Sequence, residues 1–154
     1  MQEDRSFDSG CSWLLSDTSV GRIGVFICYD LRFPESARHL LDAGADVLLL
    51  PAMWIVGPGK EDHWNTLVRA RAIENTAYVV TANQTGPLAT GYSIMVDPFG
   101  VVIANAGEAS GVIFSELSAE RIGVVRARVP SLLNRRFTVA PLEPQPGRAK
   151  PEKA

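Results

Sequence analysis

Cys28 is the residue whose side chain and position most directly suggest covalent chemistry. It stands at the end of a mainly apolar run, residues 22–28, which predicts a strand buried on both faces. The chain must then turn, because Pro34 suits the first position of a helix. Ligands of open α/β sheets collect beyond the carboxyl ends of the strands, so a thiol at this point can meet a small molecule. The sequence therefore marks Cys28 as a candidate nucleophile.

The chemistry open to such a thiol is nucleophilic attack on a substrate. The attacking species is the thiolate, so a nearby base or cation must lower the pKa of a thiol from about 8.5. A tight turn between strand and helix also exposes backbone N–H groups that can hold a developing oxyanion. Position alone leaves an alternative open, because a lone cysteine at the end of a strand is most often a small core hydrophobe.

The segments that must position Cys28 predict an α/β layered domain. Strand-like and helix-like patterns alternate, and the connections shorten after the third buried strand. We therefore expect a sheet that is parallel at first, beginning with a βαβ unit, and antiparallel later. The expected elements are strand 22–28, helix 34–44, strand 46–50, helix 62–76, strand 78–82, hairpin 92–104, strand 111–116 and helix 118–128.

The composition limits the class of protein. A chain of 154 residues with 46% hydrophobic residues can bury one core, and we expect residues 1–140 to form it. Residues 141–154 are rich in Pro, Lys and Glu, which predicts a disordered tail. A net charge of −2 with scattered basic residues indicates neither a nucleic-acid partner nor a membrane surface. The two cysteines do not make a disulfide framework, so we expect a cytoplasmic protein.

The potential metal ligands are few and scattered. Two His and two Cys without short ligand spacing predict no metal site, and no Gly-rich phosphate loop is present in the sequence. We therefore expect chemistry without a metal or cofactor.

The stretch Cys28-Tyr-Asp-Leu-Arg-Phe-Pro-Glu resembles the nucleophile motif of the nitrilase superfamily of carbon–nitrogen hydrolases. Four further blocks resemble that family in the same order, at residues 45–54, 63–75, 78–86 and 91–100. The likeness covers about residues 3–137. It implies the layered α-β-β-α sandwich of the nitrilase type. The blocks at residues 45–54 and 63–75 look closest to amidases that act on ω-amides or on deaminated glutathione.

The resemblance implies a Glu–Lys–Cys mechanism that hydrolyses a C–N bond of a small amide. Glu is the general base, Lys stabilises the tetrahedral intermediate, and Cys forms a thioester that water hydrolyses. Cys28 matches the nucleophile, and the backbone N–H of Tyr29 matches an oxyanion donor. Glu3 matches an additional active-site glutamate, the alternative being an exposed acidic residue near a terminus.

Two residues are candidate substrate contacts. Trp54 follows the second buried strand at the same edge as Cys28, and it either lines a substrate pocket or packs in the core. Arg32 either orients substrate or forms an ion pair with Glu35.

Arg71 and Glu74 are neighbours on one predicted helix. If they are buried, we expect a fixed network under the active site.

The chain departs from the family pattern before the nucleophile. The triad Glu and Lys of the family both precede the Cys, whereas only 27 residues precede Cys28 here and the first lysine is Lys60. We therefore expect the C-terminal portion of a carbon–nitrogen hydrolase, with the N-terminal part of the sandwich missing and activity absent or impaired.

Two further hypotheses follow. An incomplete sandwich exposes strand edges and apolar faces, which favours association. The chain is then a non-catalytic assembly or interaction module, and in either case we expect a homodimer or higher oligomer. A third hypothesis is a redox pair between Cys11 and Cys28, which requires their Cα atoms to lie within about 7 Å.

Overall fold

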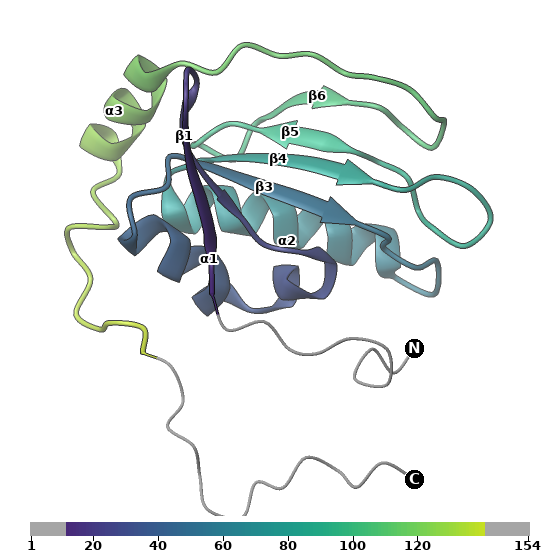
Figure 1. The fold of residues 1–154 in the computed structure, drawn as a ribbon, viewed down its shortest axis with the longest axis horizontal. Coiled ribbons are helices and arrows are strands. Elements are labelled where there is room, and N and C mark those ends of the chain that lie inside the picture. Colours follow the sequence, from purple (N-terminus) through teal and green to yellow (C-terminus); the bar gives the residue numbers. More distant parts are fainter. Residues whose placement is uncertain (1–11, 141–154) are drawn as a thin grey trace, which may run out of the picture.

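Six strands form one continuous sheet in the order β1-β2-β3-β4-β5-β6 (Figure 1). The structure, a computed structural model, describes residues 12–140. The elements are β1 (Leu14–Thr18), β2 (Gly21–Val25), the 3₁₀ turn η2 (Cys28–Arg32), α1 (Pro34–Asp42), β3 (Val47–Ala52), α2 (Lys60–Asn75), β4 (Tyr78–Asn83), β5 (Ile94–Val96), β6 (Val102–Asn105) and α3 (Ala119–Arg128).

The sheet is parallel in its middle and antiparallel at both ends. β2, β3 and β4 run parallel, with Leu48 beside Gly24 on one side and beside Val79 on the other. β5 and β6 then add antiparallel strands, as expected from the shortened connections, and β1 pairs antiparallel with β2. Because β2, β3 and β4 are parallel, their carboxyl ends share one edge of the sheet. The loops that follow them meet there.

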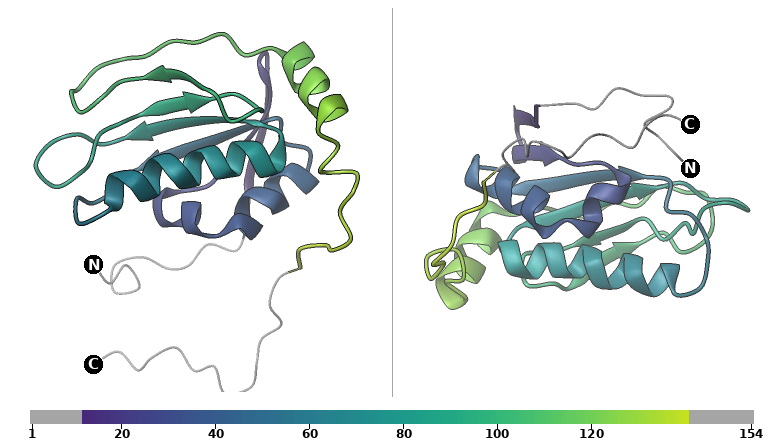
Figure 2. Two further views of the ribbon diagram at one scale, coloured as in Figure 1. Left: turned by 180° about the vertical axis from the view of Figure 1, so that it is seen from behind. Right: turned by 90° about the horizontal axis from the view of Figure 1, so that it is seen from below.

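Helices α1 and α2 cover one face of the sheet (Figure 2). The core lies between these helices and the strands, because apolar residues recur at helical spacing along both helices. α1 sits close to β2: a Cβ at Gly24 would lie 3.0 Å from the Cβ atoms of both Leu40 and Ala45. The largest fully buried side chains of this core include Trp64, Phe26, Leu31, Leu40, Leu48, Leu50, Ile94, Val68, Val79 and Val96.

The opposite face of the sheet is also apolar. α3 covers its amino-terminal end, where Ile122 packs with Val47 and Tyr78. Ser118, where the helix was expected to begin, caps it by accepting a hydrogen bond from the Arg121 N–H at 3.2 Å. Beyond α3 the face is lined by Ile23, Leu49, Val80 and Met95, around a hollow of about 530 Å³. The strands therefore carry apolar residues on both faces, as the continuous runs predicted.

Two expectations were wrong. Residues 111–116 are irregular rather than a strand, and Val112 and Phe114 are 78% and 86% exposed. Their apolar pattern is that of a strand, but the segment pairs with none of the described strands. Helical spacing predicts that Ile73 lies on the inner face of α2 together with Trp64 and Val68, but Ile73 is 48% exposed, while Arg71 is only 4% exposed.

Some predictions fall outside residues 12–140. Glu3, Cys11 and the predicted disordered tail, 141–154, lie there, so the placement of Glu3 and the Cys11–Cys28 pairing stay predictions. Among the helices of residues 12–140, none is both long enough and apolar enough to cross a membrane.

Candidate active site

Cys28 is the first residue of η2, directly beyond the carboxyl end of β2. Its side chain is partly exposed, so the thiol is not sealed into the core. Its backbone has φ +47°, in the left-handed region that residues with a Cβ rarely adopt. Such a conformation persists only where the surrounding structure holds it. The thiol therefore stands at the sheet edge on a constrained turn, as the sequence predicted for a nucleophile.

Asp30 closes this turn from within. Its Oδ2 accepts a hydrogen bond from the Ile27 N–H at 2.9 Å, and its own N–H donates to the Ile27 carbonyl at 2.9 Å. The Asp30 carbonyl in turn accepts from the Phe33 N–H at 2.9 Å. Within η2 itself, Cys28–Arg32, the first backbone N–H that donates to a backbone carbonyl is that of Asp30. The N–H groups of Cys28 and Tyr29 therefore have no acceptor inside it.

The end of β3 provides the partner of the thiol. The Cys28 Sγ donates to the Met53 carbonyl oxygen at 3.7 Å, which joins the turn after β2 to the residues after β3. The next residue, Trp54, is held on both sides. Its N–H donates to the Asn83 Oδ1 at 2.8 Å, and its carbonyl accepts from the Thr90 N–H at 2.9 Å.

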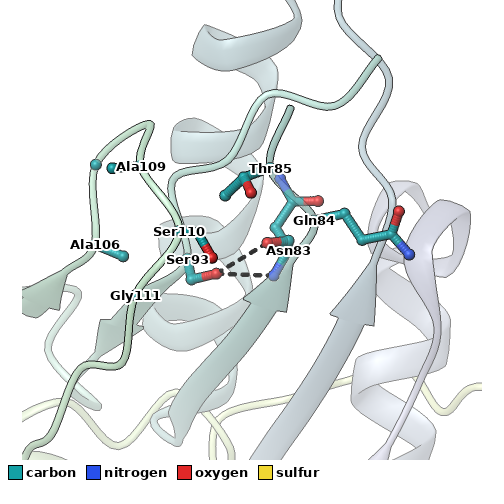
Figure 3. A pocket seen from close by; sticks show the side chains of 9 residues that line it. Asn83, Gln84, Thr85, Ser93, Ala106, Ala109, Ser110 and Gly111 are labelled. Carbon is teal, nitrogen blue, oxygen red and sulfur yellow. Dashed lines mark hydrogen bonds between the residues drawn. The ribbon is translucent and has the colours of Figure 1, made fainter. Parts of the chain in front are cut away.

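Asn83 ends β4 and connects three segments. It is 7% exposed, and besides Trp54 its side chain contacts Thr90 Oγ1 at 3.0 Å and the Gly91 carbonyl, both as donor. Its backbone N–H donates to Ser93 Oγ at 2.9 Å, and Ser93 Oγ donates back to the Asn83 carbonyl at 3.2 Å (Figure 3). A polar pocket opens beside this pair, lined by Asn83, Gln84, Thr85, Ser93, Ala106, Gly107, Ala109, Ser110 and Gly111.

Arg32 lies over aromatic rings rather than beside a carboxylate. Its guanidinium carbon is 4.6 Å from the Trp54 ring centroid and 5.4 Å from that of Tyr29. Lys60 Nζ lies 5.3 Å from the Trp54 centroid. Among the described residues, neither cation forms an ion pair, so the expected Arg32–Glu35 bridge is absent. Two positive charges therefore flank Trp54 at the edge that carries Cys28.

Trp54 itself is a core residue in this structure. It is 3% exposed, and its ring centroid lies 5.5 Å from that of Trp64. Its Nε1 donates to the Lys60 carbonyl at 2.8 Å. The plain-packing alternative thus describes the contacts of Trp54, while its role as a substrate contact stays a prediction.

The turn is also tied to α2. Arg71 donates through Nε and Nη2 to the Leu31 carbonyl at 3.1 and 2.7 Å, and through Nη1 to Glu74 Oε1 at 3.0 Å. The Arg71 side chain is 4% exposed. Its contacts with Leu31 and Glu74 therefore form the fixed network that we expected for a buried Arg71–Glu74 pair. The network lies under the turn that carries Cys28.

The sequence found some of these residues and missed others. It located Cys28, Tyr29, Arg32 and Trp54, which the structure brings to one edge. It missed the roles of Asn83 and Lys60. An asparagine at the end of a buried strand was a usable signal for Asn83, because Asn is depleted in strands. Among residues 12–140 no cluster of His, Cys, Asp and Glu is suited to a metal ion.

The mixed sheet matches solved structures of carbon–nitrogen hydrolases, and the chain belongs to that family. Residues 2–127 match the family model described as carbon-nitrogen hydrolase. The resemblance to the nitrilase superfamily is thereby confirmed. The crystal structure of Saccharomyces cerevisiae Nit3, a member of branch 10 of that superfamily, matches with a TM-score of 0.80 and 37% identity. That match covers 88% of this chain and 51% of Nit3.

Two curated relatives show which members of the family this chain is similar to. The deaminated glutathione amidase of Escherichia coli O157:H7 is 46% identical over 138 residues, which cover 89% of this chain and 53% of the relative. A protein of E. coli strain K12, named putative protein YbeM, is 46% identical over the same length and is covered to 74%. The chain thus spans about half the length of the amidase and of Nit3.

Proposed function

We propose that this chain carries the nucleophile of an amidase that cleaves a non-peptide C–N bond of a small amide through a thioester on Cys28. The observation that supports this most is the placement of a partly exposed thiol on a left-handed residue at the shared strand edge. The N–H groups of Cys28 and Tyr29, without acceptors in the turn, are suited to a developing oxyanion. In the proposed reaction the S–C bond forms, the C–N bond breaks and the amine leaves with a proton. Water then hydrolyses the thioester.

The general base and the cation of the proposed mechanism need other residues. No lysine precedes Cys28 in this sequence, and Glu3 is proposed only as an additional acid in the site. We therefore propose that the chain by itself is inactive or impaired, because a thiol without a base is mostly protonated at neutral pH. Activity then depends on a glutamate base and a lysine that residues 1–27 do not provide.

The proposed substrate class is a small amide that also bears a carboxylate. Arg32 and Lys60 both lie at the Trp54 ring without a carboxylate partner among residues 12–140, so each is available to a substrate anion. The relative named deaminated glutathione amidase supports a substrate of this kind. The resemblance to amidases of ω-amides supports it as well.

The experiment is to trap the thioester. The protein purified from its native host is incubated with an amide, quenched in acid and analysed by intact and peptide mass. We expect an acyl adduct on Cys28, alkylation of Cys28 by iodoacetamide, and no turnover in Cys28→Ala. Turnover that survives in Cys28→Ala, together with labelling that spares Cys28, would exclude the mechanism.

A second candidate function is assembly, and one observation favours it. The sheet face opposite α1 and α2 leaves Ile23, Leu49, Val80 and Met95 around an open hollow. An apolar face of this kind is typical of a surface that another layer covers. We propose that a second apolar sheet layer packs against this face. That layer corresponds to the part of the relatives that this chain does not span. We also propose that the assembly is a dimer or higher oligomer.

Light scattering after size exclusion tests the assembly, with the chain alone and mixed with the N-terminal half of the E. coli amidase. A stoichiometric complex that forms with wild type and is lost in Met95→Lys supports the second candidate. The matched control is Glu120→Lys, an exposed position on α3 outside the hollow. A chain that remains a monomer in both samples contradicts it.

A further inference from the structure

Arg71 lies on the buried face of α2, among residues that pack in the core. The buried residues of this helix are Trp64, Val68, Arg71, Ala72 and Asn75. A guanidinium in such a stripe is retained only where its donors are satisfied, because an unpaired buried charge is costly. Here three of the five N–H donors are used, two on the carbonyl of Leu31 and one on Glu74.

The carbonyl that Arg71 binds belongs to the turn of the nucleophile. Leu31 lies three residues after Cys28 within η2, and its side chain is fully buried. The bonds made by Asp30 link only residues 27–33, so they shape the turn without fixing it to the rest of the fold. Arg71 comes from a helix 40 positions along the chain, and it ties the second half of the turn to the core.

We propose that Arg71 is a positioning residue for the nucleophile turn. By holding the Leu31 carbonyl with two parallel donors, it keeps Cys28 in its left-handed conformation and keeps the Tyr29 N–H aimed at the reacting carbonyl group. The inference rests on the proposed function for its catalytic meaning. A lysine at position 71 cannot replace the arginine, because an ammonium lacks the planar fork that reaches one carbonyl twice and Glu74 at once.

Arg69 provides a matched control on the same helix. Its Nε also donates to a backbone carbonyl, that of Gly100 at 3.0 Å, in the turn between β5 and β6. A change of Arg69 to Lys therefore removes the same kind of hydrogen bond from a turn that does not carry Cys28.

The test compares two reactions of one thiol in a Cys11→Ser background, where Cys28 is the single cysteine. Iodoacetamide measures the availability of the thiolate. p-Nitrophenyl acetate transfers an acetyl group: the S–C bond forms, p-nitrophenolate leaves, and an oxyanion develops on the way. The ratio of the acylation rate to the alkylation rate isolates the contribution of the oxyanion donors. We expect this ratio to fall about tenfold in Arg71→Lys, since loss of an oxyanion donor lowers rates by about 10²–10³, and to stay within about twofold in Arg69→Lys.

Amide hydrogen exchange gives a readout that needs no chemistry at Cys28. We expect the Asp30 and Phe33 amides to exchange faster in Arg71→Lys, while the amides of β3 and of the middle of α2 keep the wild-type rates. If the ratio of acylation rate to alkylation rate in wild type is no higher than in a cysteine-containing peptide, the proposed function loses support. In that case the hydrogen-exchange data still decide the role of Arg71. An unchanged ratio together with unchanged exchange at Asp30 and Phe33 would overturn the inference.

A measurement on the unsubstituted chain covers the case in which Arg71→Lys does not fold. We expect the Nε–H of Arg71 and the backbone N–H of Phe33 to have similar protection from hydrogen exchange, because a single local opening of the turn would expose both. An Arg71 Nε–H that exchanges while Phe33 remains protected would equally overturn the inference.

Discussion

The thiol of Cys28 and the backbone carbonyl of Met53 are joined across the sheet edge, with 3.7 Å between Sγ and oxygen. This contact makes the orientation of the thiol depend on where β3 ends. That end is in turn held by Asn83, which accepts the N–H of Trp54, the residue after Met53. The geometry of the candidate nucleophile is therefore set by three parallel strands together, and not by its own turn alone.

Replacement of Asn83 by leucine should lower stability. The change keeps the volume similar but leaves the Trp54 N–H and the Gly91 carbonyl without their partner. Buried polar groups left unpaired cost about 1–3 kcal/mol each, so we expect the two together to lower the free energy of unfolding by about 2–6 kcal/mol, measured in urea. Asn134→Leu, at an exposed position, is the control and should change it by less than about 0.5 kcal/mol. Equal midpoints for the two variants would contradict the role given to Asn83.

Replacement of Cys28 by glycine should stabilise the fold relative to replacement by alanine. Both variants remove the thiol, but only glycine adopts a φ of +47° without a Cβ clash. Strain of this kind costs on the order of 1–3 kcal/mol, partly offset by the greater freedom of glycine in the unfolded chain. We expect the glycine variant to be about 1 kcal/mol more stable in urea. An alanine variant that is the more stable of the two would show that the left-handed conformation does not exist in solution.

The ion pair between Asp17 and Arg22 should add a small acid-sensitive contribution. The hydrogen bond that Arg22 donates to the Asp17 carboxylate holds the pKa of Asp17 below its ordinary value of 3.8, and the positive charge of Arg22 lowers the pKa further. A lowered pKa in the folded state means stabilisation that is complete above the unfolded value and is lost as the pH falls through the folded value. The urea midpoint of wild type should therefore fall more than that of Asp17→Asn between about pH 6 and about pH 2.5. Parallel curves would refute the assignment.

The role proposed for Arg32 separates substrates by charge. In an active preparation, Arg32→Gln should raise KM for an amide that bears a carboxylate by about tenfold, the value of one charge-assisted hydrogen bond. The KM of a neutral amide of the same size should stay within about twofold. Arg22→Gln, which changes an exposed arginine of β2 that pairs with Asp17, is the control. A similar rise in KM for both amides would assign Arg32 to packing on Trp54 instead.

The order of the elements could be predicted from local pattern. Continuous apolar runs predicted the buried strands β2, β3 and β4, helical spacing predicted α1 and α2, and a serine suited to a helix start predicted α3. Residues 111–116 show where this fails, because an apolar stretch becomes a strand only when a neighbouring strand pairs with it. Position 71 shows what local pattern leaves open: the sequence allowed Arg71 to be exposed or buried, and its burial depended on the Leu31 carbonyl of another element.

The sequence by itself determined where the buried strands end, and so placed Cys28 and Trp54 at one edge of the sheet, because strand ends follow from periodicity and length. The role of Cys28 as a nucleophile came from its resemblance to the family motif and stays a proposal. Only the tertiary structure decided which groups meet. Met53 lies 25 positions from Cys28, and Arg71 lies 40 from Leu31. Contacts over such separations arise from strand order and helix packing, which bring distant backbone groups together without leaving a mark in the local sequence.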